Sequence, residues 1–150
     1  MASDVFGLEV RHAELADLPS IVEIERTSFD EPYTPEYLEM LMRFGQGTFI
    51  VAARDGTVIG YAVASIRGRR GHILSIAVSP KERRKGVGRS LMKDIIEELK
   101  IRGVSKITLE SKRGNPAVSF YMSLGFRQVG IMPRYYHDSS DAISMELKLD

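Results

Sequence analysis

The sequence predicts a single α/β domain in which helices cover both faces of a mixed, mostly antiparallel β-sheet. Short apolar segments with strand patterning alternate along the chain with segments whose apolar residues recur at helical spacing. The dipeptide Asp55-Gly56 separates two apolar runs, which is a strong signal of a two-residue hairpin turn. A length of 150 residues, 43% of them hydrophobic, suffices for one sizeable core. We therefore expect residues 1–150 to form one domain.

The first half of the chain is expected to contain two helices and three strands. The helices begin at Asp17 and Thr34, because each can cap a helix and is followed by a proline that fits the first turn. Gly45 and Gly47 end the second helix. The strands are expected at residues 8–13, 48–53 and 57–66.

The second half begins with a strand over residues 72–78, which leads through a basic, glycine-containing turn into a helix that ends before Gly103. Asn115 and Pro116 are expected to begin a short helix as its cap and first residue, and Gly125 closes it. The remaining strands are expected at residues 105–109, 126–131 and 142–149.

The basic turn is the most informative segment. Gly86 and Gly88 lack a Cβ atom, so the chain can turn tightly there and phosphate oxygens can approach the backbone N–H groups. The first helix amides have no intrahelical partner, and the helix dipole adds partial positive charge. Three cations lie in the same turn, Arg84, Lys85 and Arg89. These features predict a site for a phosphorylated ligand, although a solvated basic loop would contain the same residues.

Two common phosphate motifs are excluded. No Gly-Lys-Ser/Thr follows, and Leu91 stands where a dinucleotide fingerprint requires its third glycine. The pattern Arg83-x-x-Gly86-x-Gly88 after a strand ending near Val instead resembles the acyl-CoA pyrophosphate loop of the GCN5-related N-acetyltransferases (GNAT).

Further segments extend this resemblance over residues 8–149. They are Gly71–Val78, Leu109-Glu110, Asn115–Ala117, Tyr121, Leu124–Phe126, Arg134–Tyr136, Asp141-Ala142 and Met145. Within the family, the chain is most similar to archaeal N-terminal acetyltransferases and to the bacterial RimI enzymes. The resemblance implies the GNAT fold and acetyl-CoA as cosubstrate.

Two side chains are candidates for the chemistry. Glu110 follows Ile107 and Leu109, which share one strand face, so its carboxylate is expected at the mouth of a buried sheet, where it can accept protons near neutral pH. The resemblance implies that Glu110 is the general base, acting through water, and that Tyr121 is the general acid that protonates the departing thiolate. A solvated strand-end acid and a core aromatic are the alternatives.

The resemblance also implies the binding residues. The strand segment Ile76, Ala77 and Val78 should separate from its neighbour and offer N–H groups to the thioester and pantetheine. The cofactor would further contact Arg84, Lys85, Gly86, Val87, Gly88, Arg89 and Asn115. Asn115 and Tyr121 are six residues apart, one fewer than the family usually has. The acceptor groove would be lined by Phe29, Tyr33, Tyr135 and Tyr136.

Composition limits the other possibilities. The net charge is +1, so the basic clusters at Arg67–Arg70 and Lys81–Arg89 fit a small anionic cofactor better than nucleic acid. Without cysteine, a covalent acyl-cysteine step is impossible, and the three histidines show no metal spacing. His72 could approach the site, although a structural role is commoner.

No apolar run approaches ~20 residues, and Met1–Val5 lacks signal-peptide features. A cytoplasmic protein without metal, membrane or nucleic-acid partners is expected.

Acid–base chemistry favours an N-terminal amine as the substrate. An α-amino group has a pKa of roughly 7.7–8.0 against about 10.4 for lysine, so one carboxylate and a water suit an N-terminal amine. We therefore predict a protein N-terminal (Nα) acetyltransferase acting by direct attack on acetyl-CoA. An enzyme for ribosomal proteins or for small-molecule amines is an alternative. A non-catalytic CoA-binding regulator is another, which Glu110 and Tyr121 together disfavour.

Overall fold

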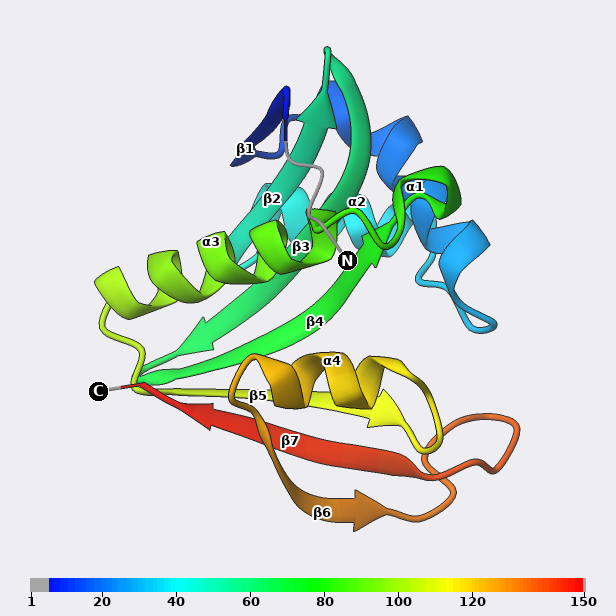
Figure 1. Cartoon of the computed structure of the whole chain (residues 1–150), viewed down its shortest axis with the longest axis vertical. Coiled ribbons are helices and arrows are strands. Elements are labelled where there is room, and N and C mark those ends of the chain that lie inside the picture. The colour runs from blue at the N-terminus through cyan, green and yellow to red at the C-terminus, as the bar shows by residue number, and fades with distance from the viewer. Residues whose placement is uncertain (1–5, 150) are drawn as a thin grey trace.

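A seven-stranded sheet organises the chain in the computed structural model, which describes residues 6–149 (Figure 1). The strand order is β1-β2-β3-β4-β5-β7-β6, and only β4 and β5 run parallel. The predicted mixed, mostly antiparallel sheet is therefore confirmed. The strands are β1 (Leu8–His12), β2 (Gly47–Arg54), β3 (Thr57–Arg67), β4 (Arg70–Val78), β5 (Lys106–Lys112), β6 (Arg127–Met132) and β7 (Ala142–Lys148).

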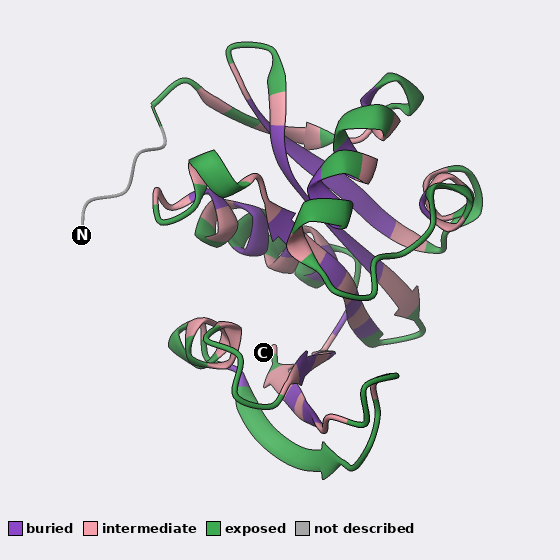
Figure 2. Cartoon of the chain, turned by 90° about the vertical axis from the view of Figure 1, so that its right-hand side faces the viewer, coloured by how far each residue is buried: buried purple, intermediate pink, exposed green. Residues whose placement is uncertain are grey.

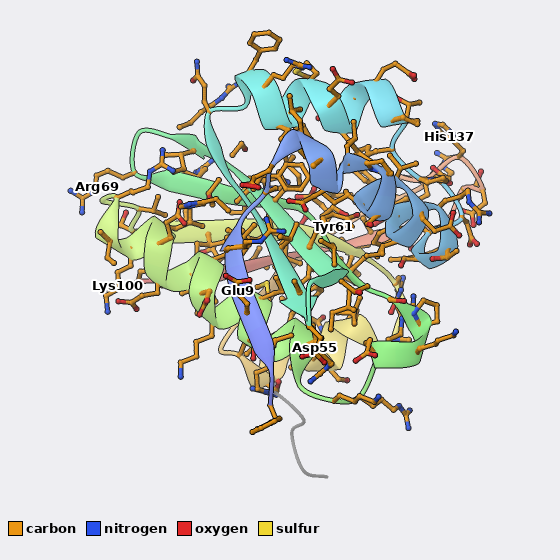
Figure 3. The ribbon with its side chains drawn as sticks, turned by 90° about the horizontal axis from the view of Figure 1, so that it is seen from above. Glu9, Asp55, Tyr61, Arg69, Lys100 and His137 are labelled. Atoms are coloured by element: carbon orange, nitrogen blue, oxygen red, sulfur yellow. The ribbon has the colours of Figure 1, made fainter. Side chains whose placement is uncertain are left out.

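Helices cover both faces of the sheet, as predicted. They are α1 (Leu18–Ser28), α2 (Pro35–Phe44), α3 (Val87–Ile101) and α4 (Ala117–Ser123). Buried residues concentrate in the central strands, whereas β6 is exposed along its length (Figure 2). The sheet lies between α1 and α2 on one side and α3 on the other (Figure 3). The α1–α2 side buries Ile21, Ile24, Leu38, Phe49, Val51, Tyr61, Val63 and Ala77, and the α3 side buries Leu91, Met92, Ile95 and Leu99 against the sheet.

The hairpin turn between β2 and β3 has the geometry that its sequence predicts. Asp55 and Gly56 have φ angles of 50° and 85°, so both central residues are left-handed. This conformation matches the twist of the flanking strands and favours Asp-Gly. Arg54 and Thr57 pair directly beside the turn.

Of the two helix caps predicted in the first half of the chain, one is correct. The Thr34 Oγ1 atom accepts a hydrogen bond of 3.1 Å from the Tyr37 N–H, which caps α2. The Asp17 carboxylate does not cap α1, because it accepts bonds of 2.8 Å from both the Arg11 guanidinium and the Glu14 N–H. The ion pair with Arg11 ties the start of α1 to β1 instead.

Two predicted boundaries were wrong near the functional residues. Glu110 does not end its strand, because pairing with β7 continues to Lys112 and Ala142. The short helix α4 begins at Ala117, one residue later than expected, because the Asn115 Oδ1 accepts a 2.8 Å bond from the Ala117 N–H in the turn before it. The expectation about Met1–Val5 falls outside the described residues. Within residues 6–149, no helix is long and apolar enough to span a membrane.

The parallel strands β4 and β5 pair over only three residues. Their partners are Arg70 with Lys106, Gly71 with Ile107, and His72 with Thr108. Beyond this point β4 continues to Val78 while β5 continues to Lys112, and the two strands diverge (Figure 1). The register between β3 and β4 also shifts, so that Leu74 has no partner. The expected separation of Ile76–Val78 from the neighbouring strand is thus confirmed.

Candidate functional site

Two cavities meet where β4 and β5 diverge. The smaller, of about 390 Å³, opens on the α1–α2 side, and the larger, of about 800 Å³, extends toward the start of α3. Both are lined by Glu110 and Tyr121, the two side chains predicted to carry the chemistry. Phe29, Glu31, Ile76 and Tyr136 also line both. A reaction between a molecule in each cavity would therefore take place beside Glu110 and Tyr121.

Aromatic side chains form the walls of the small cavity. All four residues predicted for the acceptor groove line it, Phe29, Tyr33, Tyr135 and Tyr136. The rings of Tyr135 and Tyr136 meet edge to face at 5.0 Å between centroids. The Tyr33 hydroxyl donates a 3.3 Å hydrogen bond to the Leu74 carbonyl, which fixes the α1–α2 loop against β4.

The loops on either side of the small cavity touch each other. The His137 N–H in the β6–β7 loop donates a 3.0 Å bond to the Glu31 carboxylate in the α1–α2 loop. The Lys112 ammonium lies 2.7 Å from Asp138 and 3.8 Å from Asp30, so it joins the same two loops. These contacts join the two loops beside the end of β5 that lies beyond Glu110.

The Glu110 carboxylate faces the imidazole of His72. Glu110 Oε1 lies 3.2 Å from His72 Nε2, and the other ring nitrogen, Nδ1, lies 2.7 Å from the Thr108 hydroxyl. Both His72 and Glu110 line the small cavity. A carboxylate and an imidazole in contact can share and relay a proton. The structure therefore gives His72 a chemical neighbour, beyond the structural role that its sequence position suggested.

The tyrosine hydroxyls of the site stay protonated near neutral pH. Burial, followed by the proximity of Tyr136, raises the pKa of Tyr121 to about 12. Burial and neighbouring carboxylates and tyrosines likewise raise the pKa of Tyr33 and of Tyr136 to about 12. Burial, then the charge of Glu110 and a hydrogen bond to it, raises the pKa of Tyr135. Each hydroxyl is consequently a proton donor.

The large cavity follows the unpaired edge of β4 to the glycine turn. Its lining includes the segment Ile76–Val78 together with Arg84, Gly88 and Asn115. Gly86 has a φ of 86° and precedes the first residue of α3 in a conformation that favours glycine. A Cβ at Gly88 would meet only Phe120 and Val78, at 3.7 and 3.8 Å, and both of these residues line the cavity. The start of α3 thus presents bare backbone to this space.

Four of the predicted cofactor contacts do not line the large cavity, and Gly86 is one of them. Val87 is buried in the core, at 1% exposure. Lys85 points toward Glu82, at 3.9 Å. Arg89 donates a 3.0 Å bond to Ser123 and lies over the Phe120 ring, because the helix turns its side chain toward α4. Their backbone can still shape the turn, but the cations that line the cavity are Arg83, Arg84 and Lys112.

Sequence reasoning missed a buried acid beneath the small cavity. Glu25 is 2% exposed and accepts hydrogen bonds from the Tyr33 N–H at 2.9 Å, the Ser75 hydroxyl at 3.1 Å and the Tyr61 hydroxyl. Burial raises its pKa, which the bonds from Tyr33 and Ser75 partly offset. One signal was present in the sequence, because Glu25 shares the buried stripe of α1 with Ile21 and Ile24. In residues 6–149, no group of three or more His, Asp or Glu side chains is arranged to hold a metal ion.

Comparison with known proteins gives a consistent result. The Acetyltransferase (GNAT) family is matched over residues 18–126. The chain is 35% identical to an N-alpha-acetyltransferase of Sulfolobus acidocaldarius, covering 94% of this chain and 92% of the relative. It is 31% identical to the [Ribosomal protein bS18]-alanine N-acetyltransferase of Escherichia coli, covering 91% and 94%. The structure of Ard1 from Thermoplasma volcanium superposes with a TM-score of 0.89 at 30% identity, covering 96% and 99%. The protein therefore belongs to the acetyltransferase (GNAT) family.

Proposed function

We propose that the protein transfers the acetyl group of acetyl-CoA to the α-amino group of a peptide or protein. The observation that carries this proposal is the meeting of two cavities at Glu110 and Tyr121, one with aromatic walls and one leading to a basic helix start. The similarity to an archaeal N-alpha-acetyltransferase supports an N-terminal amine as acceptor.

The large cavity fits a CoA thioester. Its volume of about 800 Å³ is in the range of cofactor sites, and Arg83 and Arg84 lie beside the free amides of α3 where a pyrophosphate needs charge and N–H donors. The unpaired edge of Ile76–Val78 offers backbone donors and acceptors to an extended pantetheine. Acetyl-CoA supplies the activated acetyl group, and backbone donors near its carbonyl would stabilise the charge that develops there.

The chain's own side chains would then move two protons. Glu110, with His72 in contact at 3.2 Å, takes a proton from the acceptor ammonium, directly or through water. The neutral amine attacks the thioester carbonyl, the C–N bond forms, the nitrogen loses its second proton to water, and the C–S bond breaks. Tyr121, protonated because its pKa is about 12, gives its proton to the departing thiolate. The chain has no cysteine, so no acyl-cysteine intermediate is required or possible.

The aromatic walls of the small cavity suit the end of a polypeptide. The rings of Tyr33, Tyr135 and Tyr136 offer apolar surface, and their hydroxyls can bond the first amides, which every peptide presents. We infer that several small or apolar first residues are accepted. A narrower enzyme for a ribosomal protein beginning with alanine is the second candidate, favoured by the similarity to the Escherichia coli enzyme. With protein N-termini as acceptors, we expect a cytoplasmic enzyme without membrane or nucleic-acid partners.

A pair of peptides tests the proposal. One has a free N-terminus, and its twin has a blocked N-terminus and one internal lysine. Mass spectrometry after incubation with acetyl-CoA should find acetylation of the free α-amine alone. Equal acetylation of the blocked lysine peptide would show a lysine or general amine acetyltransferase, and CoA binding without any transfer would show a regulatory module. Peptides beginning with Ala, Ser and Met then separate a broad enzyme from one restricted to alanine.

A further inference from the structure

Four cations stand side by side across four neighbouring strands, at the end of the sheet away from Lys112. Arg67 of β3 pairs with Arg70 of β4, Arg70 with Lys106 of β5, and Lys106 with Lys148 of β7. We call these four residues the cation row. Paired residues point to the same face, so the row spans about 14 Å at the usual strand spacing.

Most of this charge is unbalanced. Lys106 lies 3.8 Å from Glu146, but Arg67, Arg70 and Lys148 have no acidic partner among residues 6–149. Like charges directly opposite each other on a sheet destabilise it. Repulsion among these cations therefore destabilises the fold at this position, and an anionic partner outside the chain would remove that repulsion.

The cation row lies on the same face as the small cavity. A Cβ at Gly71 would meet Leu99 of α3, so Gly71 and its partner Ile107 face α3. Side chains alternate along a strand, so Arg70 and Lys106 face the opposite way, as do His72 and Glu110. Lys106 is four residues from Glu110 along β5, or about 13 Å.

The lining of the small cavity extends along β4 toward the row, whereas two loops are joined at its other side. Beyond Glu110, the contacts between Glu31 and His137 and between Lys112 and Asp138 join the two loops. On the other side the lining reaches His72, which lies two residues from Arg70 on the same face. Arg69, beside the row, and His137, beside the cavity, lie at opposite ends of the molecule (Figure 3). An extended chain whose first residue is at Glu110, and that runs along β5 away from the joined loops, would therefore reach the cation row.

We propose that the cation row is a docking site for an acidic segment of the acceptor polypeptide, a few residues after its acetylated N-terminus. This inference rests on the proposed function. Because about 13 Å corresponds to about four extended residues, Asp or Glu near positions 5–8 of the acceptor would contact the row. The aromatic cavity would accept the first residues of many proteins, and the row would select among them by charge.

Three peptides of equal length and identical first residues test this proposal. One has glutamines at about positions 5–8, the second has glutamates there, and the third has the same glutamates moved to its far end. For the wild-type protein, kcat/KM at low salt should be about fivefold or more higher for the second peptide than for the first, mainly through KM. The advantage should shrink as salt screens the charges, and the third peptide should behave like the first.

The variant Arg70→Glu lowers the formal charge of the row from +4 to +2, so it should weaken this preference markedly. A matched peptide with lysines at the same positions should be disfavoured less by the variant than by the wild type. The substitution replaces two like-charge contacts by attractive ones, so the Tm of the variant should equal or exceed that of the wild type. A Tm that is not lowered separates lost docking from misfolding. Lys93→Glu is the matched control, because Lys93 is exposed on α3 across the sheet and has no acidic partner among the described residues. This control should keep the wild-type preference.

The proposal is overturned if the wild type does not distinguish the first two peptides, or if Arg70→Glu retains the preference at its wild-type size. An RNA oligomer that binds the wild type but not Arg70→Glu, without any discrimination among peptides, would identify the row as an RNA-backbone site instead. Acetylation of the glutamine peptide reports on the proposed function separately. If none of the peptides is acetylated, that function fails and the docking proposal fails with it.

Discussion

Glu110 and His72 face each other across the point where β4 and β5 separate, with 3.2 Å between Oε1 and Nε2. His72 is the last residue of β4 that pairs with β5, and its partner there, Thr108, holds the other ring nitrogen at 2.7 Å. The strand pairing that ends at His72 thus orients the imidazole toward the carboxylate. Glu110 lines both cavities and His72 lines the small one, so substitutions can test the two side chains separately.

Replacing Glu110 by glutamine should slow acetyl transfer by roughly 10²–10⁴-fold near pH 7, because the general base is lost while the shape remains. The rate should recover in part as the pH rises and the α-amine deprotonates unaided. Calorimetry should find unchanged affinity for CoA. A wild-type rate at pH 7 would mean that the base lies elsewhere.

His72→Asn should also reduce kcat, by less than Glu110→Gln, because the carboxylate remains. Since the two side chains are in contact, their effects should not add. The double variant is therefore expected to be about as slow as Glu110→Gln alone. Steady-state rates of the wild type, the two single variants and the double variant form a double-mutant cycle. Strict additivity of the two free-energy effects would mean that His72 does not act through Glu110.

Tyr121→Phe should lower kcat and leave the fold intact. The ring keeps its contacts with Phe120 and Phe126, but the proton donor for the thiolate is gone. We expect a loss of roughly 10²-fold or more, the lower end of the range for general acid catalysis. The matched control is Tyr37→Phe, because Tyr37 lines neither cavity. Equal rates for Tyr121→Phe and the wild type would assign Tyr121 to packing.

Gly88→Glu should abolish CoA binding without unfolding the protein. A Cβ at Gly88 makes only ordinary contacts of 3.7 and 3.8 Å, so the helix accepts a side chain, but a carboxylate there would repel the pyrophosphate assigned to this turn. Gly88→Ala adds the Cβ without the charge and should retain more affinity. Calorimetric titration with CoA measures the affinity, and a melting curve checks that the variant is folded. Undiminished affinity in Gly88→Glu would place the pyrophosphate elsewhere.

The buried Glu25 should make stability depend on pH. Burial raises its pKa above the ordinary 4.5, so the ionised form is disfavoured in the folded chain. The contribution of Glu25 to stability is therefore complete below pH 4.5 and is lost as the pH rises through its folded-state pKa. As the pH rises through this range, melting curves should show the Tm of the wild type falling relative to the Tm of Glu25→Gln. A Tm difference that does not change with pH, or that shifts in favour of the wild type, contradicts the prediction.

Local sequence patterns determined the helices and strands of this protein and the character of the basic, glycine-containing turn before α3. The Asp55-Gly56 turn, the Thr34 cap and the strand–glycine–helix segment each depend on residues close together in the chain, and each has the expected form. The alternation of strands and helices predicted the mixed sheet for the same reason. Residue type and order also nominated Glu110, Tyr121 and the four aromatic residues that line the small cavity.

Tertiary structure alone decided which of these side chains share a space. The distance between β4 and β5 depends on long-range pairing that ends at His72, and no local pattern encodes where it ends. The same pairing brings His72 to Glu110 and aligns the cation row. The packing of α3 beside α4 turns Arg89 away from the large cavity. Glu25 became part of the site because its helix packs against Ser75, 50 residues later in the chain. Short-range geometry can be read from neighbouring residues, whereas these contacts arise only when distant segments pack together.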